Sequence, residues 1–270
     1  MESYMESRGD VKNGSGAEVK EKYRQLYDGL SKHFSSIRGT DYSNFLNFGY
    51  KCIGGLDEAR FNVPDGIPGG DSIRLVYELV GSVELEGRAL VDVGCGRGGP
   101  AALLSQRFGA DVLGVDLSPE AVSYCRKANA DLPIRFEVGD AEALPVADSS
   151  VDVVTNIESS HTYPNMPAFL SEVRRILRPG GWFLHTDMLS AYRWVEIRKF
   201  LDENGFVLET DREITESVLA SRDAVRRYRG GNGRMHPMLE NILGLPGSEI
   251  YELMKDGTCE YRIFRSRLKS

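Results

Sequence analysis

Short apolar runs alternate with helix-like segments through the middle of this chain, and this alternation limits the folds available to it. Five runs have the length and residue types of buried strands, at 89–93, 111–116, 134–138, 151–155 and 181–186. Segments with apolar residues at helical spacing lie between them, at 100–108, 119–129 and 166–177. Strands separated in this way are typical of a parallel sheet with helices on both faces. The pattern therefore predicts a doubly wound α/β fold.

The last third of the chain adds more helix than strand. We expect a helix at 192–203, a strand at 206–209, helical stretches at 216–229 and 238–254, and a strand at 259–268. A Gly-centred loop rather than a crossover helix precedes the last strand, so it should run antiparallel at or near the sheet edge. These elements predict a seven-stranded Rossmann-like sheet, mostly parallel with the last strand antiparallel, and a helical insertion at about 213–254.

The first 70 residues differ in composition from the rest. Residues 1–16 are polar and charged, which predicts a disordered leader. Apolar residues recur at helical spacing over 18–34, and glycines and prolines crowd 52–70, so residues 17–70 are predicted to form an N-terminal helical cap and a linker. The predicted core, 71–270, then opens with a helix at 72–83 capped by Asp71.

Composition excludes several classes of function. With 33 Lys and Arg against 40 Asp and Glu, the net charge is −7, which argues against a protein that binds the nucleic-acid backbone. No run approaches the roughly 18 apolar residues of a membrane span. The 4 cysteines show no C-x-x-C pairing, so we expect neither zinc nor disulfides, and a cytoplasmic location. His33, His185 and His236 are not grouped with acids at ligand spacing, so no metal site is expected.

A glycine-rich turn, VDVGCGRGG at 91–99, follows the first predicted strand. Ligands of open α/β sheets bind at the carboxyl ends of the strands. Gly94, Gly96 and Gly99 have the G-x-G-x-x-G spacing that dinucleotide-binding enzymes also use. Asp92 distinguishes this chain, since dinucleotide folds usually have an apolar residue there, and its carboxylate is suited to a ligand ammonium. Asp116 ends the second strand, where a carboxylate can bind both hydroxyls of a ribose.

Two further motifs complete an ordered set: GDAEALP at 139–145 and LRPGG at 177–181. With the segments at 92–98 and 114–116 they resemble the motifs of class I S-adenosylmethionine-dependent methyltransferases. The resemblance implies that Gly94 and Gly96 line the methionine portion of S-adenosylmethionine, Asp116 holds its ribose, and Asp140 and Ala141 border its adenine. The expected cofactor-binding residues are Asp92, Gly94, Gly96, Asp116, Leu117, Asp140, Ala141, Glu142 and Asn156.

A narrower resemblance rests on NIESSHTYP at 156–164, NFGY at 47–50 and EYRIF at 260–264. These segments resemble small-molecule methyltransferases of bacterial natural products, especially the phthiotriolone and macrolide O-methyltransferase group. The resemblance implies methyl transfer to a hydroxyl of a hydrophobic secondary metabolite.

Methylation of an alcohol requires a base, and His161 is the candidate. It follows the fourth strand, and an imidazole titrates near neutral pH. Related sugar O-methyltransferases carry a histidine at the matching place and an aspartate after the fifth strand, here Asp187, which would orient the imidazole. Two simpler interpretations remain. His161 is a loop histidine that binds a backbone group, or Asp187 caps the next helix in competition with Ser190.

Aromatic residues near the N-terminus are candidates for a lid over the positively charged sulfur of the methyl donor. An ordinary aromatic core explains most of them equally well. The expected substrate and lid residues are Tyr27, Tyr50, Glu158 and Tyr163, with Phe45 and Phe48 as further aromatic candidates. Glu158 is suited to contact the sulfonium or the acceptor, or to bond the glycine-rich turn. The basic run at 222–229 is expected to be a solvated helix face.

Several alternatives keep the fold and change the function. A carbon or nitrogen methyltransferase of quinone or indole metabolites would not need His161 as a base. A pericyclase-like protein would retain the cofactor without methyl transfer. A NAD-dependent dehydrogenase is disfavoured by Asp92 and by the segment at 140–142. A homodimer is the commonest closed assembly, and the sequence identifies no surface for it.

Overall fold

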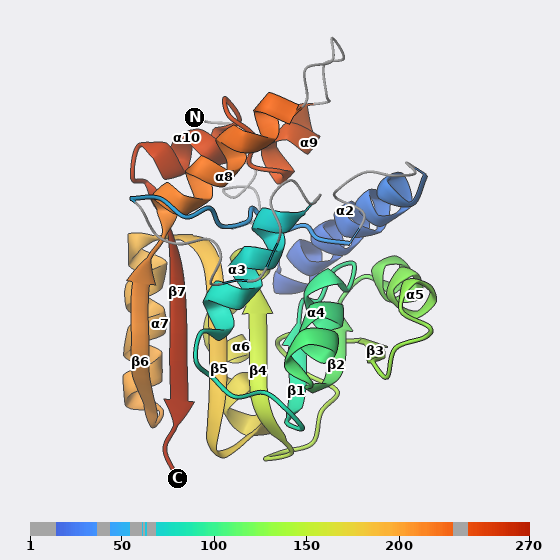
Figure 1. The fold of residues 1–270 in the computed structure, drawn as a ribbon. Helices are drawn as coiled ribbons and strands as arrows, with labels where there is room; N and C mark the ends of the chain where they lie inside the picture. The colour runs from blue at the N-terminus through green and yellow to red at the C-terminus, as the bar shows by residue number, and fades with distance from the viewer. Residues whose placement is uncertain (1–14, 37–43, 55–60, 62, 64–68, 229–236) are drawn as a thin grey trace.

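A single mixed sheet organises the molecule. The computed structural model describes residues 15–36, 44–54, 61, 63, 69–228 and 237–270. Its seven strands lie in the order β3-β2-β1-β4-β5-β7-β6, and β7 runs antiparallel to both β5 and β6 (Figure 1). The strands are β1 Ala89–Val93, β2 Asp111–Asp116, β3 Arg135–Val138, β4 Val151–Ile157, β5 Leu177–Ser190, β6 Phe206–Glu213 and β7 Cys259–Leu268. The predicted doubly wound sheet with an antiparallel last strand is confirmed.

Helices cover both faces of this sheet and create two hydrophobic cores. Figure 1 shows α3 and α4 in front of the sheet, with α6 and α7 behind it. Successive residues of a strand serve opposite cores, since Leu90 packs in the first cluster and Val91 in the second. This explains why the central strands are continuous apolar runs. The helices are α3 Gly70–Val80, α4 Gly99–Phe108, α5 Pro119–Ala128, α6 Met166–Ile176 and α7 Ala191–Glu203.

Local capping residues set the beginnings of several helices. The Ser118 hydroxyl accepts a hydrogen bond from the Ala121 amide at 3.0 Å and caps α5, as predicted. The predicted cap at Asp71 is wrong, because α3 begins at Gly70 and Asp71 lies in its first turn, where it pairs with Arg74 at 2.6 Å. That helix also ends earlier than predicted, at Val80, before Gly81 with a φ of 59°.

The helical insertion between β6 and β7 differs in detail from the prediction. It contains α8 Thr215–Tyr228, α9 Pro237–Ile242 and α10 Glu249–Lys255. The helical stretch predicted at 238–254 is therefore confirmed at its two ends and wrong over 243–248, which is not helical. Gly244 and Gly247 adopt φ values of 56° and 90° on either side of Pro246, and these residues break the helix.

The insertion and the helix α2 Gly16–Ser36 gather above the carboxyl ends of the parallel strands (Figure 1). Leu30 and Phe34 of α2 pack in one buried cluster with Leu243, which follows α9. The N-terminal helix and the insertion thus form one roof over the strand ends. We name this layer, α2 with α8 to α10, the roof.

Some sequence predictions fall on residues that the structure does not describe. Of the predicted leader, only Ser15 and Gly16 are described, and much of the linker lies outside the described ranges. The predicted solvated face at 222–229 is wrong for Arg222, which is 2% exposed and donates to the Leu243 carbonyl at 3.3 Å. The side chains of the other arginines at 222–229 lie outside the described part of the chain.

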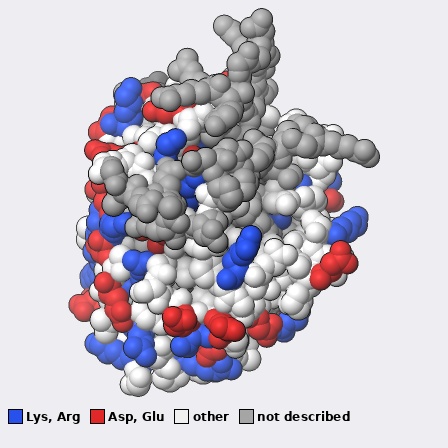
Figure 2. All heavy atoms as spheres, viewed as in Figure 1, with Lys and Arg blue, Asp and Glu red and all other residues white. Residues whose placement is uncertain are grey.

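The described surface is mixed in charge. Figure 2 shows basic and acidic side chains interspersed over the described part of one face, so this face presents no extended basic surface. No helix among the described residues combines the length and apolar composition needed to cross a membrane.

The two cores predict where substitutions destabilise the fold. Leu104 on α4 is fully buried, so Leu104→Ala should lower the free energy of unfolding by about 2–5 kcal/mol through the cavity it leaves. Val195 on α7 is 57% exposed, and Val195→Ala should change the free energy of unfolding by less than about 0.5 kcal/mol. Urea unfolding followed by circular dichroism measures both. Equal losses in the two variants would contradict this description of the core.

Candidate active site

A cavity lies between the strand ends and the roof. The predicted site residues that line it are His161, Asp187, Asp92, Gly94, Gly96, Asp116, Leu117, Asp140, Ala141, Glu142, Tyr27, Glu158 and Tyr163. They come from segments throughout the chain, because parallel strands end at one edge of the sheet. Two predicted residues, Asn156 and Tyr50, do not line the cavity.

The glycine-rich turn forms one wall of the cavity and requires its glycines. Gly94 and Gly96 have φ values of 72° and 53°, in the left-handed region that disfavours side chains. A Cβ atom on Gly94 would collide with the side chain of Ser159 and lie 2.8 Å from the Tyr163 hydroxyl. The backbone of the turn therefore borders the cavity directly.

Asp92 presents an unsatisfied buried oxygen at the base of the cavity. Its Oδ1 accepts a hydrogen bond from the Thr155 hydroxyl at 2.7 Å, and Oδ2 has no hydrogen-bond partner in the described part of the chain. Burial raises the pKa of this carboxyl to about 7. A buried carboxylate oxygen beside an open cavity fits the ammonium group of a methionine moiety.

Asp116 lies at the end of β2 on the same wall. Its two oxygens accept hydrogen bonds from the amides of Gly96 and Ser118, at 2.8 and 2.9 Å. Burial raises its pKa to about 6, although both hydrogen bonds oppose that change. Each oxygen has a second lone pair, so the fixed carboxylate can also accept from two neighbouring hydroxyls, as a ribose provides.

The roof is tied to this wall by a residue that the sequence analysis missed. Lys20 of α2 forms ion pairs with Asp140 and Glu142, each at 2.6 Å. The acids were predicted from their motif, whereas Lys20 is 120 residues from Asp140 and carries no local signal. These contacts place α2 over the position expected for adenine.

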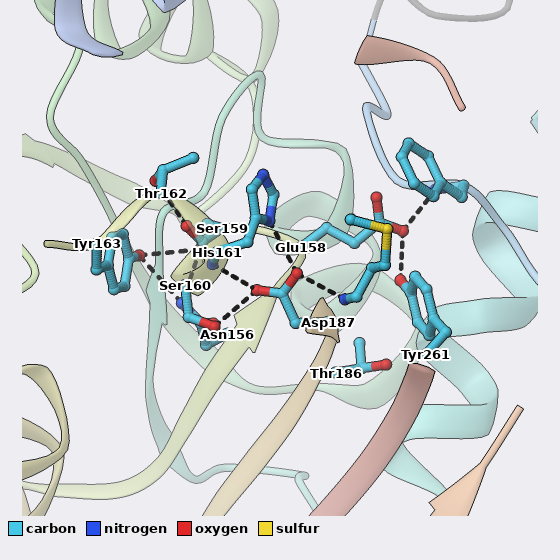
Figure 3. A network of polar contacts seen from close by, with 12 residues as sticks. Asn156, Glu158, Ser159, Ser160, His161, Thr162, Tyr163, Thr186, Asp187 and Tyr261 are labelled. Carbon is cyan, nitrogen blue, oxygen red and sulfur yellow. Dashed lines mark hydrogen bonds and ion pairs between the residues drawn. The ribbon is translucent and has the colours of Figure 1, made fainter. Parts of the chain in front are cut away.

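His161, in a short 3-10 helix after β4, and Asp187, three residues before the end of β5, form a hydrogen-bonded pair (Figure 3). The His161 Nδ1 lies 2.8 Å from Asp187 Oδ1, and the His161 amide donates to Oδ2 at 3.0 Å. Burial opposes the ionisation of Asp187, but its interactions with His161, His185 and Ser160 hold the pKa of this carboxyl below its ordinary value. Ser190 caps α7, so the alternative role of Asp187 as a helix cap is wrong.

Ser160 and His185 support this pair and were not predicted to do so. The Ser160 hydroxyl donates to Asp187 Oδ2 at 2.6 Å and lies 2.9 Å from His185 Nε2. Burial lowers the pKa of His185 to about 4, so this ring is neutral. Because Ser160 has one proton to donate, His185 Nε2 must carry the hydrogen in the second contact. Strand pairing creates this chain of contacts, and sequence spacing does not reveal it.

Several aromatic and amide residues have other positions than expected. Tyr50 is 1% exposed and packs edge-on against Phe61 in the first core, so its assignment to the lid is wrong. Phe45 packs against the same core, while Phe48 lines the cavity. Asn156 is fully buried and donates to the Val93 carbonyl at 2.9 Å and to Ser159 at 2.7 Å, behind the cavity wall.

Metal ligands are not grouped in the part of the chain that the structure describes. No cluster of three or more His, Cys, Asp or Glu side chains there could hold a metal ion. His236 lies outside the described residues.

Comparison with known proteins agrees with this geometry. Residues 91–185 match the family described as a methyltransferase domain. A fatty-acid O-methyltransferase of Mycolicibacterium smegmatis is 32% identical over 82% of this chain and 81% of its own. The chain belongs to the class I S-adenosylmethionine-dependent methyltransferases. A second relative of this methyltransferase, a probable phthiotriol/phenolphthiotriol dimycocerosates methyltransferase 2 of Mycobacterium ulcerans, is 34% identical over 70% of this chain and 76% of its own.

Solved structures share the fold of this methyltransferase. Geranyl diphosphate C-methyltransferase from Streptomyces coelicolor, solved with S-adenosyl-L-homocysteine, has a TM-score of 0.69 and 18% identity over 92% of this chain and 98% of that one. The 4+2 cyclase SpnF has a TM-score of 0.70 and 19% identity over 92% and 95% of the two chains. At this identity both likenesses establish the fold alone.

The position of Asp116 predicts its contribution to cofactor affinity. Asp116→Ala should weaken the binding of S-adenosylhomocysteine by about 1–3 kcal/mol, because ribose hydroxyls lose their acceptor. Asp111→Ala, at the exposed opposite end of β2, is the matched control and should leave the affinity unchanged. Calorimetric titration compares the two. An unaltered Kd in Asp116→Ala would remove Asp116 from the cofactor site.

Asp92 predicts that cofactor affinity depends on pH. Its carboxyl has a pKa of about 7 without ligand, and only the ionised form pairs with an ammonium. The affinity for S-adenosylhomocysteine should therefore rise as pH increases toward 7, by up to about tenfold per unit, and level off above it. Asp92→Asn should flatten this dependence near pH 7. A smaller dependence at lower pH should remain, because the carboxyl of Asp116 has a pKa of about 6. Titrations in buffers of different ionisation enthalpy should show proton release for the native protein. A flat profile in the native protein would contradict the assignment.

Proposed function

We propose that this methyltransferase transfers a methyl group from S-adenosylmethionine to a hydroxyl of a hydrophobic small molecule. The hydrogen-bonded pair of His161 and Asp187, on the cavity wall, carries this proposal. Names of the curated relatives support the class of reaction and acceptor, since one is a fatty-acid O-methyltransferase and another is a probable phthiotriol/phenolphthiotriol dimycocerosates methyltransferase.

The cavity walls support an apolar acceptor. Beyond the glycine-rich turn and the strand-end acids, the roof and the β5 end contribute mainly apolar side chains. They include Leu26, Leu30, Met188, Ile242 and Ile250, and the segment before α3 adds Leu46 and Phe48. Such a lining favours an acceptor with a hydrocarbon body and excludes water from its reacting end.

In the proposed mechanism His161 removes the proton of the acceptor hydroxyl. S-adenosylmethionine, held by the glycine-rich turn, Asp92 and Asp116, would supply an activated methyl group, which the acceptor oxygen would take as the sulfur–carbon bond breaks. Nδ1 of His161 donates to Asp187, which makes Nε2 the ring atom that receives the proton. Asp187 stays ionised and stabilises the imidazolium that results. Asp187 also accepts a hydrogen bond from the His161 amide, and this bond fixes the backbone position from which the imidazole ring extends.

The test uses 2-decanol, decanoic acid and a matched histidine control. His161→Gln should reduce the kcat for methylation of 2-decanol by about 10²- to 10⁴-fold, because the general base is lost. The affinity for S-adenosylhomocysteine should not change. His33→Gln changes a histidine of α2 that does not line the cavity, and it should behave as the native enzyme. Mass spectrometry of the product and release of S-adenosylhomocysteine measure turnover.

Other outcomes would redirect the assignment. Unchanged turnover in His161→Gln would remove the base from the mechanism. Methylation of decanoic acid alone, unaffected by His161→Gln, would point to a carboxylate acceptor. Methylation of carbon or nitrogen acceptors in place of the alcohol would support the alternative of a carbon or nitrogen methyltransferase. Conversion of a substrate without release of S-adenosylhomocysteine would indicate a protein that retains its cofactor without methyl transfer.

A further inference from the structure

Glu158 is held in a strained conformation on the cavity wall. Its φ is 50°, and among the described residues the one other non-glycine with positive φ is Ser149. A left-handed conformation is unfavourable for a long side chain, and such strain concentrates at functional sites. The Glu158 amide donates to the Thr186 carbonyl at 2.9 Å, which anchors the strained backbone to β5. This conformation directs the Glu158 carboxyl to the cavity wall, beside β7.

Two hydrogen-bond donors converge on one oxygen of this carboxyl. The Phe48 amide donates to Oε1 at 2.6 Å, and the Tyr261 hydroxyl also contacts Oε1 (Figure 3). An amide can only donate, and burial raises the pKa of Tyr261, so the phenol keeps its proton and donates as well. Figure 3 shows the second oxygen, Oε2, without a partner among the residues drawn.

The surroundings of Glu158 favour its uncharged form. Burial raises its pKa to about 8, and the negative charge of Asp187 on β5 acts in the same direction. The bonds from Tyr261 on β7 and from Phe48, and the more distant charge of Arg222 on α8, oppose this change without cancelling it. At neutral pH the carboxyl is therefore mainly protonated. Since Oε1 already accepts two donors, the acid proton must lie on Oε2.

His161 and Glu158 are the two polar side chains beside the expected acceptor position, and they differ in their role toward a proton. His161, three residues after Glu158, accepts a proton, whereas a protonated Glu158 donates a hydrogen bond. Both line the same cavity, and Figure 3 shows them on either side of Asp187. An acceptor with a single hydroxyl uses one of these groups, covers the other and leaves it without a hydrogen-bond partner, which is unfavourable.

We infer that Glu158 is a specificity-determining residue whose Oε2–H donates to a second oxygen of the acceptor. Preferred acceptors then carry a carbonyl, ether or hydroxyl oxygen close to the hydroxyl that is methylated. This inference rests on the proposed O-methylation and adds the class of acceptor. It assigns Glu158 to the acceptor rather than to the methyl donor.

The experiment compares three acceptors that share one chain length. 2-Decanol has a lone hydroxyl, while 3-hydroxydecan-2-one and 4-hydroxydecan-2-one add a carbonyl at one of two spacings. The native enzyme should show a kcat/KM about tenfold or more higher for at least one hydroxyketone than for 2-decanol. Each preference is a ratio within one enzyme, so partial loss of folded protein does not affect it.

Two substitutions separate hydrogen bonding from packing. Glu158→Gln keeps an oxygen for Phe48 and Tyr261 and places an N–H at the position of Oε2, so it should retain the preference. Glu158→Leu removes the donor and should bring the ratio close to one. Titration with S-adenosylhomocysteine should give the native affinity in both variants.

The pH dependence provides a readout that a packing role would not change. The pKa of Glu158 is raised to about 8, so its donor is present below that pH and is lost as pH rises through it. The preference for the hydroxyketone should therefore fall above about pH 8 in the native enzyme and stay constant in Glu158→Gln.

The outcomes distinguish failure of the inference from failure of the proposed function. Methylation of all three acceptors with equal kcat/KM, or a preference that persists in Glu158→Leu, would overturn the role of Glu158 alone. A large loss of S-adenosylhomocysteine affinity in Glu158→Gln would assign the residue to the methyl donor. No methylation of any of the three alcohols by the native enzyme would overturn both proposals.

Discussion

The buried carboxylate of Asp187 is the charge on which the geometry of this active site depends. It is completely excluded from solvent, and an unpaired anion in such a place would be strongly unfavourable. Four groups stabilise it: the amides of His161 and Met188, the hydroxyl of Ser160 and the ring of His161. Meeting these requirements joins the end of β5 to the turn after β4. The position of His161 is therefore a consequence of satisfying a buried charge.

Asp187 and Glu158, the two carboxyl groups beside the expected acceptor position, have opposite protonation states. In each case the arrangement of hydrogen-bond donors around the carboxyl is the reason. Asp187 accepts from donors on both oxygens and stays ionised, whereas both donors to Glu158 meet one oxygen and leave the other for a proton. Neighbouring acids whose pKa values are moved apart are typical of enzymes that need a base and a donor at neutral pH. Asp187 is fully buried, whereas Glu158 lies partly buried on the cavity wall.

Sequence patterns predicted the residues whose role depends on the secondary structure immediately around them. Asp116 could be assigned because it ends a strand next to a glycine-rich turn, and Ser118 because it precedes a helix. The same patterns assigned Asn156 and Tyr50 to the cavity, although both are buried elsewhere. Position near a strand end does not specify which side of the wall a side chain occupies. Neither Lys20 nor His185 carries a local signal, since their partners come from distant segments.

The sequence by itself determined the sheet, the glycine-rich turn and the edge where the acids gather, because these follow from periodicity and from the common direction of parallel strands. Tertiary structure alone decided which donors surround each buried acid and how the roof closes on the cavity. Those contacts join residues far apart in the sequence, such as Lys20 and Asp140, which are 120 positions apart. The protonation states follow from them, because the charge of a buried group depends on its partners and its exclusion from water.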